Sequence, residues 1–172
     1  MKTKNKIIIL AAVVLIIGLV IIFVLPKDKK NSNEVPKYVI EKSTNTNCQY
    51  IYGKLCFSIP DDYKCVGANN CQLSNDNDML LVEVFIEENY KDSLEKYLEI
   101  NKKGYSALDN QETKEIKNTT WIVGDNKYKI EKYYYTKVDN DIYEVKLLSM
   151  KDSGGKYDEL IKVIEGSIKI NN

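Results

Sequence analysis

The chain of 172 residues contains no histidine and no arginine. Without histidine it has no imidazole to act as a base for a serine or cysteine nucleophile, to ligate a metal, or to titrate near neutral pH. Without arginine it has no planar guanidinium for two-point capture of phosphate or carboxylate groups. The basic residues are therefore all lysines, and they balance the acidic residues to a net charge of zero. The sequence predicts no catalytic residue, no cofactor and no metal ligand, and it argues against nucleic acid as a partner.

Charged and hydrogen-bonding side chains are also missing from residues 7–25, IIILAAVVLIIGLVIIFVL. As a helix this run would be about 28 Å long, which matches the hydrocarbon core of a bilayer. The alternative is a cleaved signal peptide, but the run is longer than such segments and ends in FVLPKDKK, without a small-x-small cleavage site. We therefore expect residues 1–6 to form a short cytoplasmic tail and residues 7–25 to form a transmembrane helix in the lipid bilayer.

Residues 26–47 are polar and lack apolar periodicity, so they predict a flexible linker to a domain at residues 48–172. Lysines flank the apolar run almost equally on both sides, so the positive-inside rule does not decide its orientation. The cysteines favour one answer, because an even number of them clustered in a small domain is typical of an oxidising compartment. We expect a single-pass protein of the cell membrane with its C-terminal domain outside the cytoplasm.

The four cysteines can pair in three ways. Cys48 and Cys56 flank a glycine turn, and Cys65 and Cys71 are separated by a short loop. Pairing each cysteine with the next one in the sequence is therefore the easiest arrangement. We expect disulfides between Cys48 and Cys56 and between Cys65 and Cys71. A redox or metal site is the alternative, but there is no C-x-x-C spacing and no imidazole beside the thiols.

Alternating apolar residues predict the strands of this domain. They fall at about residues 50–52, 55–59, 78–88, 119–123, 127–138 and 142–150. The last three are joined by short turn-forming segments, so they are expected to form an antiparallel meander.

Two helices are predicted, at residues 92–104 with Asp92 as the N-cap, and at about residues 156–165. The expected fold class is therefore α+β, with the N-terminal transmembrane helix followed by an antiparallel β-sheet domain that carries helices packed on it.

Three consecutive tyrosines stand in the stretch KIEKYYYTKVDND at residues 129–141. Strand alternation places Tyr134 on the core face, and Tyr133 and Tyr135 on the opposite, mixed face. Those two side chains either lie beneath a second-layer helix or form an exposed aromatic surface for a partner.

The expected elements are, in order, short strands with YGKLCFSIPDDY, a further strand, the helix SLEKYLE, a three-strand meander and a closing helix before GSIKI. This order resembles the PsbP-like family over about residues 48–170. Tyr63 stands where that family often has tryptophan, and the cysteines are not part of its pattern. The resemblance implies a PsbP-like sandwich and a role as an accessory or binding module, with no active site to transfer.

Together these features predict a membrane-anchored, non-catalytic domain that binds an envelope protein or an extracellular ligand. Two alternatives remain open. One is an envelope hydrolase that uses carboxylates alone, with two acids converging in a cleft. The other is a structural subunit of an envelope complex.

Overall fold

The computed structural model describes residues 36–44, 48–73, 80–101, 108–126, 130–149 and 155–171, which belong to one compact unit from Pro36 to Asn172. The expected transmembrane helix at residues 7–25 and most of the expected linker at residues 26–47 lie outside the described residues.

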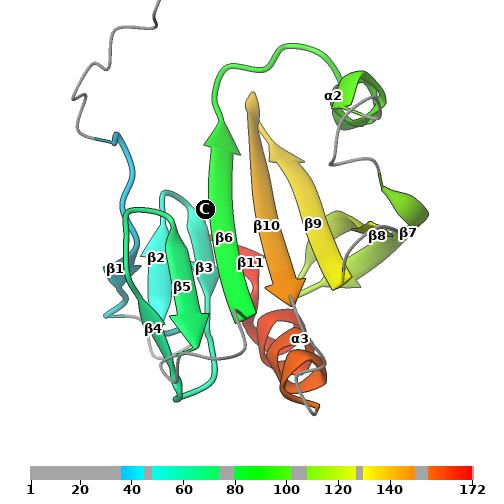
Figure 1. Cartoon of the computed structure of the whole chain (residues 1–172). Helices are drawn as coiled ribbons and strands as arrows, with labels where there is room; N and C mark the ends of the chain where they lie inside the picture. The colour runs from blue at the N-terminus through cyan, green and yellow to red at the C-terminus, as the bar shows by residue number, and fades with distance from the viewer. Residues whose placement is uncertain are drawn as a thin grey trace, which may run out of the picture. The chain divides into compact units, whose positions relative to one another are not determined.

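The larger of two sheets has seven strands, and every neighbouring pair is antiparallel (Figure 1). In spatial order the strands are β4 (Tyr63–Cys65), β5 (Asn70–Leu73), β6 (Leu80–Glu87), β10 (Asp141–Ser149), β9 (Ile130–Val138), β8 (Thr119–Asn126) and β7 (Asp109–Ile116). Strands β7 to β10 are consecutive in the chain, so this half of the sheet is an antiparallel meander. The meander therefore contains one strand more than the sequence predicted, namely β7.

The smaller sheet has four short strands in the order β1 (Glu41–Lys42), β2 (Tyr50–Tyr52), β3 (Leu55–Phe57) and β11 (Lys169–Ile170). The two described helices are α2 (Leu94–Asn101) and α3 (Lys156–Ser167). Both helices were predicted, but the cap of α2 differs from expectation. The Ser93 hydroxyl oxygen accepts a hydrogen bond from the Lys96 backbone amide at 3.2 Å, while the Asp92 side chain forms an exposed ion pair with Lys96.

The main core lies between one face of the seven-stranded sheet, helix α3 and the smaller sheet. Its largest fully buried side chains are Trp121, Tyr134 and Phe57. Tyr134 is the middle tyrosine of the triplet, and the prediction that it belongs to the core is confirmed. Its hydroxyl donates to Glu165 of α3 at 3.1 Å, and Lys114 of β7 pairs with the same carboxylate at 2.6 Å. Glu165 therefore ties α3 to two strands of the sheet.

The expected fold class is wrong. The described part of the chain is mostly antiparallel β-sheet, and its two helices have only 8 and 12 residues, so it is not the α+β sandwich that was expected. No helix within the described residues is both long and apolar enough to cross a membrane. The physical reason for the wrong fold class is that several strands are short or polar, and neither kind gives a clear alternation of apolar residues.

Both predicted disulfides are confirmed. Cys48–Cys56 joins the segment before β2 to β3, and Cys65–Cys71 joins β4 to β5 at directly opposite positions of the two strands. None of the cysteines is free. Each bridge links segments whose strands otherwise pair at only three positions, so the cross-links support short pairings with few ladder hydrogen bonds.

Gly53 is required by the turn between β2 and β3. Its φ is +59°, and a Cβ atom at this position would lie 2.7 Å from Cδ1 of Ile86. We expect Gly53→Ala to lower the free energy of unfolding by about 1–2 kcal/mol, since a residue with a Cβ pays roughly that for left-handed backbone. Urea unfolding measures the change. The matched control is Gly166→Ala in α3, where a Cβ would meet nothing within 4 Å. That control should be neutral or slightly stabilising, and a Gly53 variant that behaves the same way would contradict the assignment.

Candidate functional site

The face of the seven-stranded sheet that points away from α3 carries a regular array of polar and aromatic side chains. Strand β10 lies between β6 and β9, and its alternate residues Ile142, Glu144 and Lys146 share this outer face. Glu144 lies directly opposite Phe85 of β6 and Tyr135 of β9. The next row places Lys146 opposite Glu83 of β6 and Tyr133 of β9, and the row before it places Ile142 opposite Glu87 and Lys137.

Helix α2 covers one end of this face. The segment that leads into the helix is fastened to the turn between β9 and β10, because the Tyr90 amide donates to the Asn140 carbonyl at 2.6 Å and the Asn89 amide donates to Asp141 at 3.1 Å. Lys137 adds a hydrogen bond to the Asp92 carbonyl at 2.7 Å. The apolar stripe of α2, with Leu98 at its centre, packs on Tyr133, Tyr135 and Ile142. The helix is thus held at a fixed place above the sheet.

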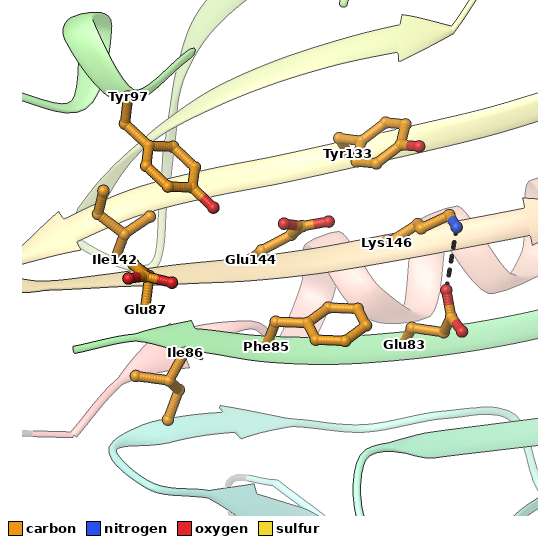
Figure 2. Close-up of a pocket in the computed structure, with 9 residues that line it drawn as sticks. All are labelled: Glu83, Phe85, Ile86, Glu87, Tyr97, Tyr133, Ile142, Glu144 and Lys146. Carbon is orange, nitrogen blue, oxygen red and sulfur yellow. Dashed lines mark ion pairs between the residues drawn. The ribbon is translucent and has the colours of Figure 1, made fainter. Parts of the chain in front are cut away.

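A cavity of about 360 Å³ lies on this face beside α2. We call it the outer-face cavity, and Figure 2 shows the nine residues that line it. They are Glu83, Phe85, Ile86, Glu87, Tyr97, Tyr133, Ile142, Glu144 and Lys146. The volume falls in the range of small-molecule sites, and the mixture of apolar walls with a few charged groups is usual for such sites.

Phe85 is the most unusual residue of the cavity, because this large apolar residue is 40% exposed. It is one of only four large hydrophobic residues that are exposed in the described part of the chain. Figure 2 shows its ring beside Glu144, on the neighbouring strand. An exposed aromatic ring in a concave site offers apolar contact area, and its removal from water by a ligand is favourable.

Glu144 is the carboxylate with the most perturbed titration. Burial raises the pKa of Glu144 to about 7, and the nearby charge of Glu83 acts in the same direction, whereas Lys146 and a hydrogen bond from the Tyr135 hydroxyl act against it. No lysine lies within ion-pair distance of this carboxylate among the described residues. Glu144 therefore changes its charge close to neutral pH, inside the cavity.

Lys146 is already engaged by other groups. Its ammonium lies 3.0 Å from Glu83, and Figure 2 marks this ion pair. It also lies 3.8 Å from Glu131, a residue of β9 that is 4% exposed, and 6.0 Å from the centre of the Tyr133 ring. Because Glu131 is buried, the lysine compensates a charge that would otherwise be costly. Lys146 thus pairs with two carboxylates at one end of the cavity.

The structure places Tyr133 and Tyr135 in the interior, with 3% and 2% of each residue exposed. Their rings stack with their centres 5.9 Å apart, and the ring centre of Tyr97 of α2 lies 6.3 Å from that of Tyr135. The Tyr133 hydroxyl donates a hydrogen bond to Glu131 at 2.9 Å. They do not form an exposed aromatic surface. Of the two alternatives left open by the sequence, the structure shows the one in which both side chains lie beneath a helix. The physical reason is that α2 needs an apolar partner for its own stripe. Tyr133 still contributes one wall of the outer-face cavity.

A second cavity of about 420 Å³ lies at the turn between β7 and β8. Its lining is mostly lysine, asparagine and threonine. Two of its polar groups are already used within the fold, since Thr136 donates to the Thr120 carbonyl at 2.8 Å and Lys137 donates to Asp92. Over the residues that the structure describes, no group of three or more acidic or sulfur side chains could hold a metal ion. The outer-face cavity is therefore the stronger candidate site.

No model of a known protein family matches the chain, and no curated protein matches it either. The resemblance to the PsbP-like family thus remains a prediction from the sequence pattern, and the functional argument depends on the residues of the site.

Strand alternation places Glu83, Phe85 and Glu87 on one face of β6, but the sequence does not identify them as part of a site. The missing information was the pairing of β6 with β10, two strands that lie about sixty residues apart in the chain. Alternation within residues 141–149 does place Glu144 and Lys146 on one face. That signal shows a polar face, but it does not show what lies beside it.

Proposed function

We propose that the domain is a non-catalytic binding module that works outside the cytoplasm and holds its ligand in the outer-face cavity. The observation that carries this proposal is the half-exposed Phe85 ring inside a cavity that also contains a partly buried carboxylate, Glu144. Such a combination of apolar contact area and a few oriented charges is how binding sites obtain both affinity and specificity.

The two disulfides support the location. Disulfides persist in secreted and extracytoplasmic proteins and are rare where thiols are kept reduced. All four cysteines are paired, and Cys56 and Cys71 are fully buried. Labelling with a thiol reagent that does not cross membranes, applied to intact cells before and after reduction, tests location and pairing together.

The binding proposal is tested with a small set of soluble fragments, comprising aliphatic amines, carboxylates, sugars and phosphates. The protein is the full chain in a non-ionic detergent, which the apolar run at residues 7–25 requires, and binding is followed through backbone amide shifts. We expect at least one class to shift amides of β6 and β10 around Phe85, and we expect Phe85→Ser to weaken that binding at least tenfold, because the ring supplies most of the exposed apolar contact.

The matched control is Ile100→Ser, since Ile100 is 61% exposed on α2 but does not line the cavity. This variant should bind the same fragments with unchanged affinity. Absence of any fragment that shifts these amides, or binding that is indifferent to Phe85, would remove the cavity as a binding site.

A carboxylate-dependent hydrolase remains a second candidate because of one specific observation. Hydrolysis of glycosides needs one protonated acid and one ionised carboxylate on either side of the bond. Glu144, whose pKa is raised to about 7 by burial, shares the cavity with Glu83 and Glu87. Turnover of chromogenic glycosides by the full chain that disappears in Glu144→Gln would favour catalysis over binding alone.

A further inference from the structure

We propose that the outer-face cavity binds its ligand through a primary ammonium group, which lies against Phe85 and pairs with the Glu144 carboxylate. This inference rests on the proposed binding function and assigns the chemical class of the ligand.

The charges of the cavity point to a cation. Of the residues that line it, three are glutamates and one, Lys146, is basic. Lys146 already pairs with Glu83 at 3.0 Å and with the buried Glu131 at 3.8 Å. When Glu144 is ionised, the cavity therefore contains a carboxylate whose charge is not neutralised by an ion pair with any lysine of the described residues. An anionic ligand would meet repulsion from this group, whereas an ammonium would complete the pairing.

The walls of the cavity favour a cation attached to an alkyl chain. Phe85 lies directly opposite Glu144 across the β6–β10 pair and is 40% exposed. Tyr97 reaches down from α2, and Tyr133 forms the side towards β9, so aromatic rings surround the carboxylate (Figure 2). Ring faces attract ammonium groups by about 0.5–2 kcal/mol, depending on desolvation, and the apolar rings also contact the methylene groups next to the charge.

Titration of Glu144 makes the interaction dependent on pH. The groups that face Glu144 are Glu83 and Glu87 of β6, Tyr133 and Tyr135 of β9, Tyr97 of α2 and Lys146 of its own strand. Burial raises the pKa of Glu144 to about 7, and burial also raises the pKa of Tyr133 and of Tyr135, so these two tyrosines stay neutral between pH 6 and pH 8. An ammonium that binds the ionised carboxylate should bind roughly tenfold more weakly at pH 6 than at pH 8, because the ionised fraction falls by about that factor.

The test uses n-pentylammonium, the neutral compound 1-pentanol, which has the same chain length, and a capped tripeptide with one central lysine. Affinities for the full chain are measured at pH 6 and pH 8 from the amide shifts of β6 and β10. We expect pentylammonium to bind, pentanol to bind at least tenfold more weakly, and Glu144→Gln to weaken pentylammonium about tenfold at pH 8 while removing its pH dependence. Glu112→Gln is the control of equal charge change, because Glu112 lies exposed on the edge strand β7, and it should have no effect.

The two ammonium compounds distinguish the source of the group. Tighter binding of the tripeptide indicates a lysine of a partner protein, and binding of pentylammonium alone indicates a free small amine. Equal binding of pentanol, or a Glu144→Gln variant that binds pentylammonium as well as the wild type, would overturn the inference. If sugars or carboxylates bind in a manner dependent on Phe85 and both amines do not, the binding function stands and the ammonium assignment falls.

Discussion

Replacing all four cysteines by alanine is expected to lower the free energy of unfolding by about 5 kcal/mol, or about 2.5 kcal/mol for each disulfide. The bridges close short loops, with sequence separations of 8 and 6. In the chain-entropy description, loops of this length confine the unfolded chain by about that amount. A loss of 5 kcal/mol is a large part of the total stability of an ordinary domain.

Urea unfolding of the full chain measures the effect. The two pairs Cys48→Ala/Cys56→Ala and Cys65→Ala/Cys71→Ala should each give about half of it, and their effects should add because the bridges join different strand pairs. The wild type with a reductant serves as a check that lost cross-linking, rather than lost side-chain volume at the buried Cys56 and Cys71, explains the change. If removal of either disulfide lowers the free energy of unfolding by less than about 0.5 kcal/mol, that bridge contributes little to stability.

Local signals in the sequence were sufficient for several elements. The stripe of apolar residues spaced three and four apart predicted α3, and the spacing of the cysteines predicted both disulfides. Strict alternation around the tyrosine triplet assigned Tyr134 to the core, where it bonds to Glu165. In each case the residues that carry the signal lie within one element or one short loop, so no knowledge of distant pairing is needed.

The fold class was missed because some strands carry no such signal. Strand β7, with sequence DNQETKEI, is exposed at five of its eight positions, since it lies at an edge of the sheet. It turns into β8 through Lys117 and Asn118, which both have left-handed backbone with φ of +49° and +62°. That conformation is usual for a two-residue hairpin, but lysine is an uncommon residue for it. The polar composition of an edge strand resists aggregation, and it also makes the strand hard to recognise.

The outer-face cavity could not be read from the sequence for a different reason. Its carboxylates and aromatic rings come from β6, α2, β9 and β10, and only the pairing between distant strands brings them together. The two tyrosines that the sequence offered for an exposed surface lie beneath α2, whereas the exposed ring is Phe85. A face with mixed composition can be identified from alternation, but which of its members remain exposed depends on the helix that covers it.

The titration of Glu144 should make the protein less stable as the pH rises. Burial raises the folded-state pKa of Glu144 to about 7, compared with an ordinary value of 4.5 in the unfolded chain. Between those two values the folded state keeps a proton that the unfolded state has released, so stability is fully present below about pH 4.5 and is lost as the pH rises through about 7. The largest loss that such a shift allows is about 3 kcal/mol, since each pKa unit corresponds to about 1.4 kcal/mol.

We therefore expect Glu144→Gln to be more stable than the wild type at pH 8, by about 1–3 kcal/mol, and we expect this difference to fall below about 1 kcal/mol at pH 5. The measurement is the urea midpoint at pH 5, 6, 7 and 8, and the difference between the two proteins isolates Glu144 because every other titrating group is shared. Glu112→Gln should follow the wild type at each pH. If the urea midpoints of the wild type and of Glu144→Gln change with pH in parallel, burial does not raise the pKa of the carboxylate.

A stabilising substitution at this position has a functional meaning. Proteins keep a costly buried charge where a ligand uses it, so the stability gained by Glu144→Gln should be accompanied by weaker binding of an ammonium. A saturating amine should also return part of the missing stability to the wild type at pH 8, because binding to the folded state alone raises its stability. The same amine should not stabilise the glutamine variant. The two effects together would link the energetic cost of Glu144 to the use of the cavity.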